Sequence, residues 1–561
     1  MKLHRLKLPQ GFRSLEPGFE IHFLRDMEMD HLWDFRPYVL VGRNGSGKSN
    51  LLEALAHIFY HLECMTLRNL PDSFLYEEEK NPDGWRNHRA LIDEYELEYF
   101  ISSERAKKEL PMWVKIKAAP AFPAGEEVAH VHFTKSKGEA PKIRVNNSEH
   151  GELGSSGFRS FLPEYVLGYS SGENEILSLP FQKMRFINFD EIKEKNQSES
   201  QFTSPEGRLV YLDASYSQAM LLCIYLMSPE PELDVFKKYL GFMGVLSFRL
   251  VIKHLQYENP DYGITSTPYS TQRYITLTNS LSSTVNKLKL CATAFNENNN
   301  SLTLDFFTDH QSKEAFNFHF ENDPLLLFQA LQSVLIMNLH TVSEEQKKDI
   351  YQSSSLYLAD SLPEPGDADK IAHVTHLTID KPRSFEMRLR SLSDGEHQLL
   401  HSLNLFLLFR NKSALFLLDE PETHFNPDWR AEFITTLKNC LPERDEIPTT
   451  RELLITSHSP FIVSDSPREN VLVFKKDQMG KVSCQRPEFR TFGASVNLIN
   501  IRIFDKDDTI GQVAKTVLDQ LYERYEKGEN ADLLIEEANA VLGDSVEKTI
   551  FINHLKGERL A

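Results

Sequence analysis

The sequence predicts an α/β protein that carries an antiparallel β subdomain and a helical insertion. The first observation behind this prediction is a glycine-rich loop near residue 45, which lies between a strand-like apolar run and a helical pattern. Alternation with a period of two residues follows that loop, and a second strand-and-helix segment begins near residue 371. Periods of 2 and 3.6 residues are typical of strands and helices, so the three segments together indicate a mixed fold.

The glycine-rich loop fills the P-loop pattern, with an apolar run (38–41) before it and apolar residues at helical spacing behind it. Glycines let successive N–H groups turn toward phosphate oxygens, and a helix N-terminus favours an anion. We therefore expect Lys48 to reach the phosphates of ATP and Ser49 to bind Mg²⁺. A structural glycine turn is the alternative, which the flanking patterns disfavour. The predicted nucleotide-binding residues are Gly42, Arg43, Asn44, Gly45, Ser46, Gly47, Lys48, Ser49 and Asn50.

Period-two alternation beside this loop predicts an antiparallel meander. It occurs at 94–101, 112–117 and 128–133, and the Gly, Pro and Ser-rich segment 118–157 supplies turns. A further strand is expected at 165–172, followed by a polar linker around 191–207. From 208 to 348 the pattern predicts mainly helices, with strand-like pieces near 301–307. The chain has no internal repeat and no sustained a/d heptads, so a long coiled coil is not expected.

An acidic pair follows the next buried strand. The apolar run 414–418 leads directly into Asp419 and Glu420. At the carboxyl end of a strand, Asp419 is placed to bind Mg²⁺ directly or through water, and Glu420 to polarise an attacking water. A helix-start cap is the simpler interpretation of such a pair. The P-loop in the same chain favours a Walker B element instead.

Two more elements complete the pattern. At the start of an apolar helix, a short glycine-containing segment forms an anion cradle, which is redundant within one chain and is explained if it serves a neighbour's nucleotide. Its residues, predicted to act in trans, are Ser393, Asp394, Gly395 and Glu396. Farther on, a buried strand (453–456) delivers His458, whose imidazole is placed to hydrogen-bond a γ-phosphate. An isolated histidine there is usually a structural cap, but this one follows the other elements in order.

These four elements resemble the Walker A, signature, Walker B and switch-histidine elements of ABC-type ATPase heads in SMC, MutS, RecF and OLD-family proteins. The form DEPETHFNP is most similar to the OLD-like branch. The resemblance implies that Lys48 and Ser49 bind phosphate and Mg²⁺, that Asp419 binds Mg²⁺, and that Glu420 is the catalytic base. It also implies that His458 acts as the switch. Ser393 would complete the site of a second head, so a homodimer or higher homo-oligomer is expected.

The chain departs from those families at two points. Asp394 stands where many relatives have glycine, and no Q-loop glutamine is identifiable, Gln182 being a weak candidate. The resemblance divides the chain into a first head lobe with Walker A and the meander (1–190) and a mainly helical insertion (191–370). A second lobe with signature, Walker B and switch histidine (371–490) and a C-terminal helical region (491–561) follow.

A narrower resemblance extends over most of the chain. The runs LEPGFEIHF, NLLEALAHIFYHLE, YSSGENEILSLPF, LSDGEHQLLHSLNLFLLF, TFGASVNLINIRIFDKDDTIG and GDSVEKTIFINHL are similar to the PtuA ATPases of Septu antiviral systems. This implies an ATP-dependent sensor or regulator whose partner is a separately encoded HNH nuclease, PtuB. Some of these ATPases are retron effectors, which adds a reverse transcriptase and its nucleic acid to the implied partners.

Two other functions compete with this one. A self-contained OLD-type nuclease needs a Toprim domain with its carboxylate cluster, for which the residues after Phe492 are few. A DNA-repair motor or clamp like RecF or an SMC protein is the other: the missing coiled coil argues against SMC, and the acidic charge argues against a constitutive DNA clamp. With 62 basic and 81 acidic residues, the net charge of −19 argues against indiscriminate nucleic-acid binding.

Composition favours a cytoplasmic protein. No run approaches a membrane span, and the N-terminal residues lack the apolar core of a signal peptide. Five cysteines lie far apart without CxxC spacing, so we expect reduced core thiols, neither disulfides nor a zinc site. They are Cys64, Cys223, Cys291, Cys440 and Cys484.

Overall fold

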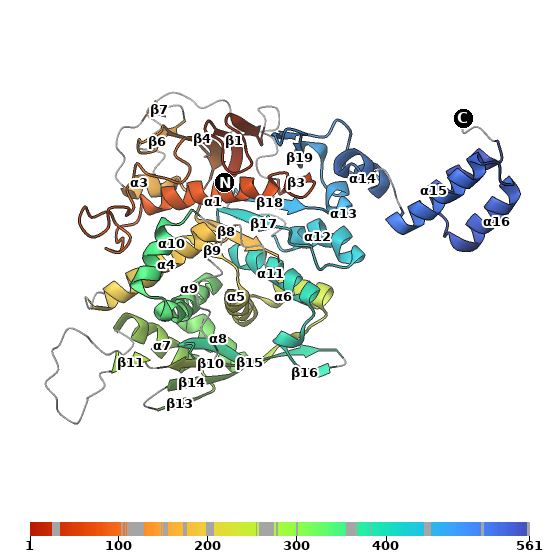
Figure 1. Cartoon of the computed structure of the whole chain (residues 1–561). Coiled ribbons are helices and arrows are strands. Elements are labelled where there is room, and N and C mark those ends of the chain that lie inside the picture. The colour runs from red at the N-terminus through yellow and green to blue at the C-terminus, as the bar shows by residue number, and fades with distance from the viewer. Residues whose placement is uncertain are drawn as a thin grey trace.

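The protein is layered, as the computed structural model in Figure 1 shows. The structure describes residues 1–24, 34–102, 105–106, 108, 128–146, 148–149, 155–171, 177–197, 207–253, 255–256, 274–275, 279–298, 301–354, 366, 369–382, 384–441, 450–506 and 510–557. From top to bottom in the figure lie an antiparallel sheet, the helix α1 (Lys48–Cys64), a mainly parallel sheet, a layer of helices, and a second antiparallel sheet.

The central sheet has seven strands, all parallel except the edge strand β20. Its order is β20 (Val482–Gln485), β19 (Val471–Lys476), β3 (Tyr38–Gly42), β18 (Glu452–Ser457), β17 (Ala414–Asp419), β8 (Tyr165–Ser170) and β9 (Leu209–Tyr211). The strands β3, β17 and β18 are buried along their length because layers cover both faces of the sheet. Their carboxyl ends therefore meet at one edge, as the sequence predicts for the phosphate loop and the acidic pair.

The upper sheet confirms the predicted meander where the chain is described. Its order is β2 (Phe19–His22), β1 (Lys2–Leu8), β4 (Tyr95–Ile101), β5 (Ala129–Lys135), β6 (Lys142–Val145) and β7 (Ser148–Glu149). In β4 the side chains of Tyr95, Leu97 and Tyr99 are fully buried, whereas the intervening glutamates are half-buried. The strand expected at 112–117 lies outside the described residues. One core joins this sheet, α1 and one face of the central sheet.

The lower half contains more strand than the sequence pattern indicates. A five-stranded antiparallel sheet runs β13 (Ala294–Glu297), β14 (Ser301–Phe307), β10 (Gly244–Lys253), β15 (Ala372–Lys381) and β16 (Ser384–Arg388). The strand near 301–307 was expected, but β10 was not, although its buried Phe248, Leu250 and Ile252 alternate. A short pair, β11 (Leu255–Gln256) and β12 (Tyr274–Ile275), stands beside it. Helix α4 continues to Gln197, into the segment expected to be a linker.

Helices fill the space between the central sheet and this lower sheet. The helices of the body are α3 (Ser155–Ser160), α4 (Leu179–Gln197), α5 (Ala214–Met227), α6 (Glu230–Leu240), α7 (Asn279–Cys291), α8 (His310–His319), α9 (Pro324–Leu335), α10 (Glu344–Gln352), α11 (Asp394–Phe409), α12 (Pro427–Asn439), α13 (Pro460–Ser464) and α14 (Val496–Phe504). The larger core lies here, where α5, α9 and α11 pack between the two sheets. No single described helix is both long and apolar enough to cross a membrane, although the bent pair Pro324–Thr341 and Glu344–Gln352 meets the length and composition test jointly.

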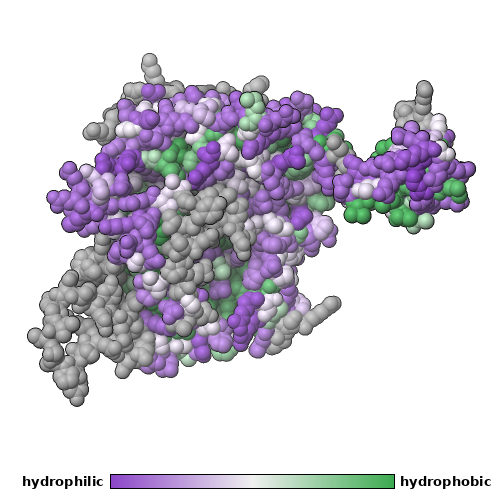
Figure 2. Space-filling view, in the orientation of Figure 1, coloured by the Kyte–Doolittle hydropathy of each residue, from purple (hydrophilic) through white to green (hydrophobic). Residues whose placement is uncertain are grey.

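Three C-terminal helices form a separate small unit, set apart from the body in Figure 1. They are α15 (Gln512–Glu526), α16 (Ala531–Val541) and α17 (Val546–Leu555), and they enclose their own core. Apolar side chains also gather on the outside of this unit, as Figure 2 shows in green. The exposed members are Val513, Leu533, Val541, Val546 and Ile550.

All five cysteines are free thiols, as expected from their spacing. Cys64, Cys223, Cys291 and Cys440 are buried, and Cys484 is half-buried. Burial raises the pKa of the Cys291 and Cys484 thiols to about 12, so both remain protonated at neutral pH.

Candidate ATP site

The predicted phosphate loop connects β3 to α1 and requires glycine at two positions. Gly42 has φ +148°, and a Cβ there would lie 2.2 Å from the carbonyl oxygen of Phe474 on the neighbouring strand. Gly47 is the N-cap of α1 in the left-handed region, with φ +95°. Side chains at these positions would distort the loop. The loop thus presents its backbone to the space above the helix N-terminus, where a phosphate is favoured.

A cavity of about 500 Å³ lies over this loop. It is lined by Asn44, Gly45, Ser46, Gly47, Lys48, Ser49, Asn50, Glu420 and His458. These residues come together because Asp419 pairs with Thr456 between the parallel strands β17 and β18, and Ser457 pairs with Val41 on β3. Three strand ends distant in sequence therefore supply one site, in agreement with the rule for open α/β sheets.

The loop supplies two donors toward the cavity. Lys48 Nζ donates to the carbonyl oxygens of Gly42 and Arg43, at 3.2 Å each. Burial lowers the pKa of Lys48, against the opposing influence of the nearby carboxylates, of which Glu420 ranks first. The Ser46 hydroxyl is buried and has no hydrogen-bond partner among the described residues. A buried donor without a partner is unfavourable, so an anion in this cavity would satisfy it.

Asp419 joins the P-loop to the strand end beside it. Ser49 Oγ donates to Asp419 Oδ1 at 2.8 Å, and Thr456 Oγ1 donates to the same oxygen at 2.6 Å. Burial raises the pKa of Asp419, and these two hydrogen bonds act in the opposite direction. Thr456 was not predicted, although it directly precedes the Ser457-His458 pair in sequence. The arrangement presents a hydroxyl and a carboxylate oxygen side by side, and oxygen ligands are those that Mg²⁺ prefers.

Glu420 and His458 face each other at the cavity. His458 Nε2 lies 3.2 Å from Glu420 Oε1. This neighbour is the largest influence that lowers the pKa of Glu420, so the carboxyl is ionised at neutral pH. The backbone of Glu420 is left-handed, with φ +49°, and its N–H donates to Thr456 Oγ1 at 2.9 Å. Such a conformation is unfavourable for glutamate and persists only where surrounding contacts hold it.

A third acidic residue of the same loop was missed by the sequence analysis. Glu422 is fully buried and accepts a hydrogen bond from Ser457 Oγ. Burial raises the pKa of Glu422 to about 7. Its other carboxylate oxygen has no partner among the described residues. Its only sequence signal is its place two residues after Glu420 in DEPET, where alternation gives no reason to expect burial.

The predicted signature segment does not line this cavity. Ser393 is the N-cap of α11 and forms a reciprocal capping box with Glu396, whose carboxylate accepts from the Ser393 N–H at 2.8 Å. Asp394 and Gly395 follow in the first turn, and a Cβ at Gly395 would lie 2.7 Å from the His424 carbonyl oxygen. Gln182 on α4 does not line the cavity either.

One protein-family model matches the parts of the chain that carry this site. The family model described as "AAA domain, putative AbiEii toxin, Type IV TA system" matches residues 38–109 and 290–464. The two matched segments contain every residue predicted here for the site. Among curated proteins, none matches.

Two solved structures are also similar to this chain. The recombination mediator protein RecF with ATPrS matches at 11% identity and a TM-score of 0.31, covering 86% of this chain and 97% of that one. RecF with ATP matches at 11% identity and a TM-score of 0.29, covering 82% and 94%.

The AAA-domain match and the cavity over the P-loop define the class of protein. A glycine loop at a helix N-terminus, a strand-end aspartate beside the P-loop serine, and an ionised glutamate at the mouth are the parts of an ATP-hydrolysing site. The chain is a P-loop ATPase.

Proposed function

We propose that this chain is an ABC-type ATPase that regulates a partner HNH nuclease within an antiphage defence complex. One observation supports it above the others. The cavity gathers Lys48, Ser49, Glu420 and His458, with Asp419 behind it on Ser49, while the cap at Ser393 lies outside it. A site divided in this way is completed only when a second head supplies its own cap, and such closure is a two-state element that regulation needs.

In this proposal Ser49 Oγ and Asp419 Oδ1, which share a hydrogen bond of 2.8 Å, would hold Mg²⁺. When bound, the metal would supply positive charge that offsets the charge of the β- and γ-phosphates. Lys48 and the loop N–H groups hold the phosphates. Glu420, ionised and at the cavity, orients and deprotonates the attacking water, and His458 beside it senses the γ-phosphate.

The partner part of the proposal is supported by the run of Septu-like motifs along the chain and not by the site itself. Two or more copies associate through their heads, and Ser393 of each copy contacts the nucleotide of the other. The HNH nuclease cuts nucleic acid, and ATP-driven closure positions or restrains it. In systems that contain a retron, the reverse transcriptase and its nucleic acid join the complex.

A nuclease assay tests this division of labour. The purified chain is incubated with DNA and with RNA, with Mg²⁺ or Mn²⁺, with and without ATP, and then again with the HNH protein encoded beside it. We expect cleavage only when the partner is present. Cleavage by the chain alone that survives stringent purification would overturn the proposal.

A self-contained nuclease is the second candidate, and one observation favours it. His4, Glu98 and His130, on adjacent strands of the upper sheet, offer ligand atoms that all lie within 4.8 Å of one another. If the chain alone cuts nucleic acid, Glu98→Gln should abolish the cleavage, whereas Glu432→Gln on the exposed side of α12 should not.

A further inference from the structure

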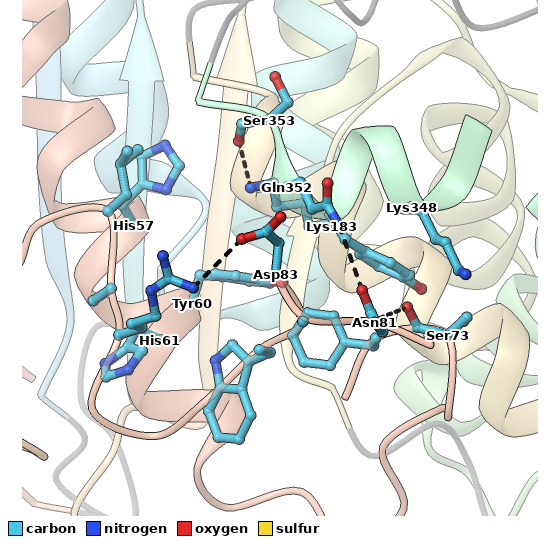
Figure 3. A pocket seen from close by; sticks show the side chains of 17 residues that line it. His57, Tyr60, His61, Ser73, Asn81, Asp83, Lys183, Lys348, Gln352 and Ser353 are labelled. Atoms are coloured by element: carbon cyan, nitrogen blue, oxygen red, sulfur yellow. Dashed lines mark hydrogen bonds and ion pairs between the residues drawn. The ribbon is translucent and has the colours of Figure 1, made fainter. Parts of the chain in front are cut away.

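A second cavity of about 460 Å³ lies along the same helix that begins at the P-loop. Figure 3 shows its lining, which comes from α1, from the loop 73–91, from α4 and from α10. His57, Tyr60 and His61 place it about three helical turns from Lys48. Its volume falls within the range of about 300–1,000 Å³ typical of small-molecule sites. Nothing in the ATPase reaction uses it.

One end of this cavity carries positive charge without a carboxylate to balance it. Lys183 is buried, and its Nζ donates to the Ser353 carbonyl oxygen at 2.7 Å. Among the described residues, no carboxylate oxygen lies within 4.0 Å of that amine. Burial lowers the pKa of Lys183 to about 8, which still leaves it largely charged at neutral pH. A buried cation of this kind is stabilised by an anion, and the cavity gives one access.

Two further cations line the cavity. Lys348 comes from α10, and Arg89 from the loop lies 3.7 Å from the Asp83 carboxylate. The ionised lining thus comprises three cations and one carboxylate, because burial keeps His57 and His61 neutral by lowering the pKa of each. The cavity therefore favours an anionic ligand.

The other side is aromatic and has unused hydrogen-bonding groups. Phe74 and Trp85 stack with ring centres 5.7 Å apart, and Tyr351 meets Phe74 edge-on at 4.9 Å. Trp85 Nε1 and His57 Nε2 are buried and have no hydrogen-bond partner among the described residues. The Glu53 carboxylate lies 3.8 Å from His57 Nε2, too far for a hydrogen bond. Flat apolar walls with such groups suit a planar ring with polar edges.

We propose that this cavity is a second ligand site, and that it binds a nucleoside monophosphate with the phosphate at Lys183 and the base against Trp85 and Phe74. An anionic group would balance the charge of Lys183, and a planar polar ring would provide partners for Trp85 Nε1 and His57 Nε2. Nucleoside monophosphates combine the two at a size that the cavity admits. The site is separate from the P-loop and does not depend on the function proposed above.

The test is calorimetric titration of the full chain with AMP, GMP, CMP and UMP in turn. The Lys48→Ala background weakens nucleotide binding at the P-loop, so that remaining binding reports on the second cavity. In that background we expect at least one monophosphate to bind. Adding Lys183→Met should weaken its affinity by about 10-fold or more, since a charge-assisted contact is lost. Trp85→Phe, which keeps an aromatic ring but removes the N–H, should weaken it by about 5-fold.

Three controls make the outcome decisive. Lys142→Met removes an exposed lysine of the upper sheet and should leave the affinity unchanged. Far-UV circular dichroism and thermal unfolding establish that each variant is folded, and Lys183→Arg serves if the methionine variant is not. Absence of binding by all four monophosphates at about 1 mM overturns the proposal, as does unchanged affinity in folded Lys183→Met. Inorganic phosphate or adenosine binding as tightly as AMP would also overturn it. In the first case the aromatic side would add nothing to the affinity, and in the second case Lys183 would add nothing.

Discussion

The two cavities on α1 differ in what holds them. The cavity at the N-terminus of the helix is built by backbone and by strand ends, with Gly42 and Gly47 in conformations that favour glycine. The cavity farther along is built by side chains from four separate segments. A site made from backbone depends on a few fixed residue types at fixed spacing. A site made from scattered side chains has no such spacing, and only the folded chain reveals it.

Contacts also run from one cavity to the other. Asn50, at the first cavity, donates to Glu53 at 3.3 Å. Arg13 donates to Glu53 at 3.0 Å and to the Ser354 carbonyl oxygen at 2.6 Å. Ser354 follows Ser353, whose carbonyl oxygen accepts the hydrogen bond from Lys183. The cavities therefore share a helix and a side-chain network, and we nevertheless expect them to behave as separate sites.

The largest expected effect is on ATP turnover. Glu420→Gln removes the proposed base and leaves Asp419 and the P-loop in place, so turnover should fall by about 10²–10⁴-fold while ATP binding is retained. Lys48→Ala should instead weaken ATP binding itself. Steady-state phosphate release and nucleotide binding measure the two, with Glu432→Gln as the control. Neither change should alter monophosphate affinity at the second cavity, and near-normal turnover in Glu420→Gln would refute its role.

Much of this first site is predictable because it follows strand ends. Asp419 and Glu420 come directly after an apolar run, Lys48 follows one through the glycine-rich loop, and His458 follows the end of another strand. Parallel strands bring such residues to one edge of the sheet. Thr456 and Glu422 were missed because their roles depend on contacts between segments distant in sequence. Thr456 pairs with Asp419 between the strands β17 and β18 and donates a hydrogen bond to it, and Glu422 accepts a hydrogen bond from Ser457. Local sequence does not encode either contact.

The second cavity could not be predicted either, because its residues meet only through long-range contacts in the fold. Lys183 and Trp85 lie almost a hundred residues apart and belong to no motif, and burial of a lysine runs against its usual exposure. In the fold, the missed strand β10 pairs regularly with β14, but its register with β15 shifts between Val245 and Arg249, which blurs the alternation at that end. Segments with flanking glycines and strict periods were predictable, and long-range pairings were not.

A smaller effect on ATP turnover is expected at Ser393, the cap outside the first cavity, and it depends on the proposed association of two heads. Ser393→Arg should hydrolyse ATP poorly, because the proposed neighbouring site loses the serine that completes it. Mixed with a Lys48→Ala chain, it should form dimers with at most one intact composite site. Turnover of the mixture and nucleotide-dependent association, followed by analytical ultracentrifugation, measure this.

The matched control for that substitution is Ser343→Arg, which removes a similar capping box at α10. Loss of a cap costs about 1 kcal/mol in either variant, so a shared loss of stability is expected and is not informative. Normal turnover by Ser393→Arg, with no effect of nucleotide on association, would exclude the action of Ser393 in trans.

A buried group with a shifted pKa lies near each cavity, Glu422 in the loop after β17 and Lys183 in the second cavity, and the two shifts affect stability in opposite directions. The pKa of Glu422 is raised from 4.5 to about 7, so the folded chain binds more protons than the unfolded chain between those values, and stability falls as pH rises through that window. The pKa of Lys183 is lowered from 10.5 to about 8, so stability rises with pH between about 8 and 10.5.

The smallest expected effect follows from the first of these shifts. Glu422→Gln keeps the size and hydrogen-bonding capacity of the side chain but cannot ionise, so it should remove a loss of stability of up to about 3 kcal/mol between pH 4.5 and 7.5. Urea unfolding at a series of pH values measures the free energy of unfolding for both proteins. Lys183→Met is the control, since its effect belongs above pH 8 and should leave the slope of the lower window unchanged. If the wild-type and Glu422→Gln curves run parallel from pH 4.5 to 7.5, Glu422 does not titrate with a raised pKa, and the burial of its carboxyl is relieved in solution.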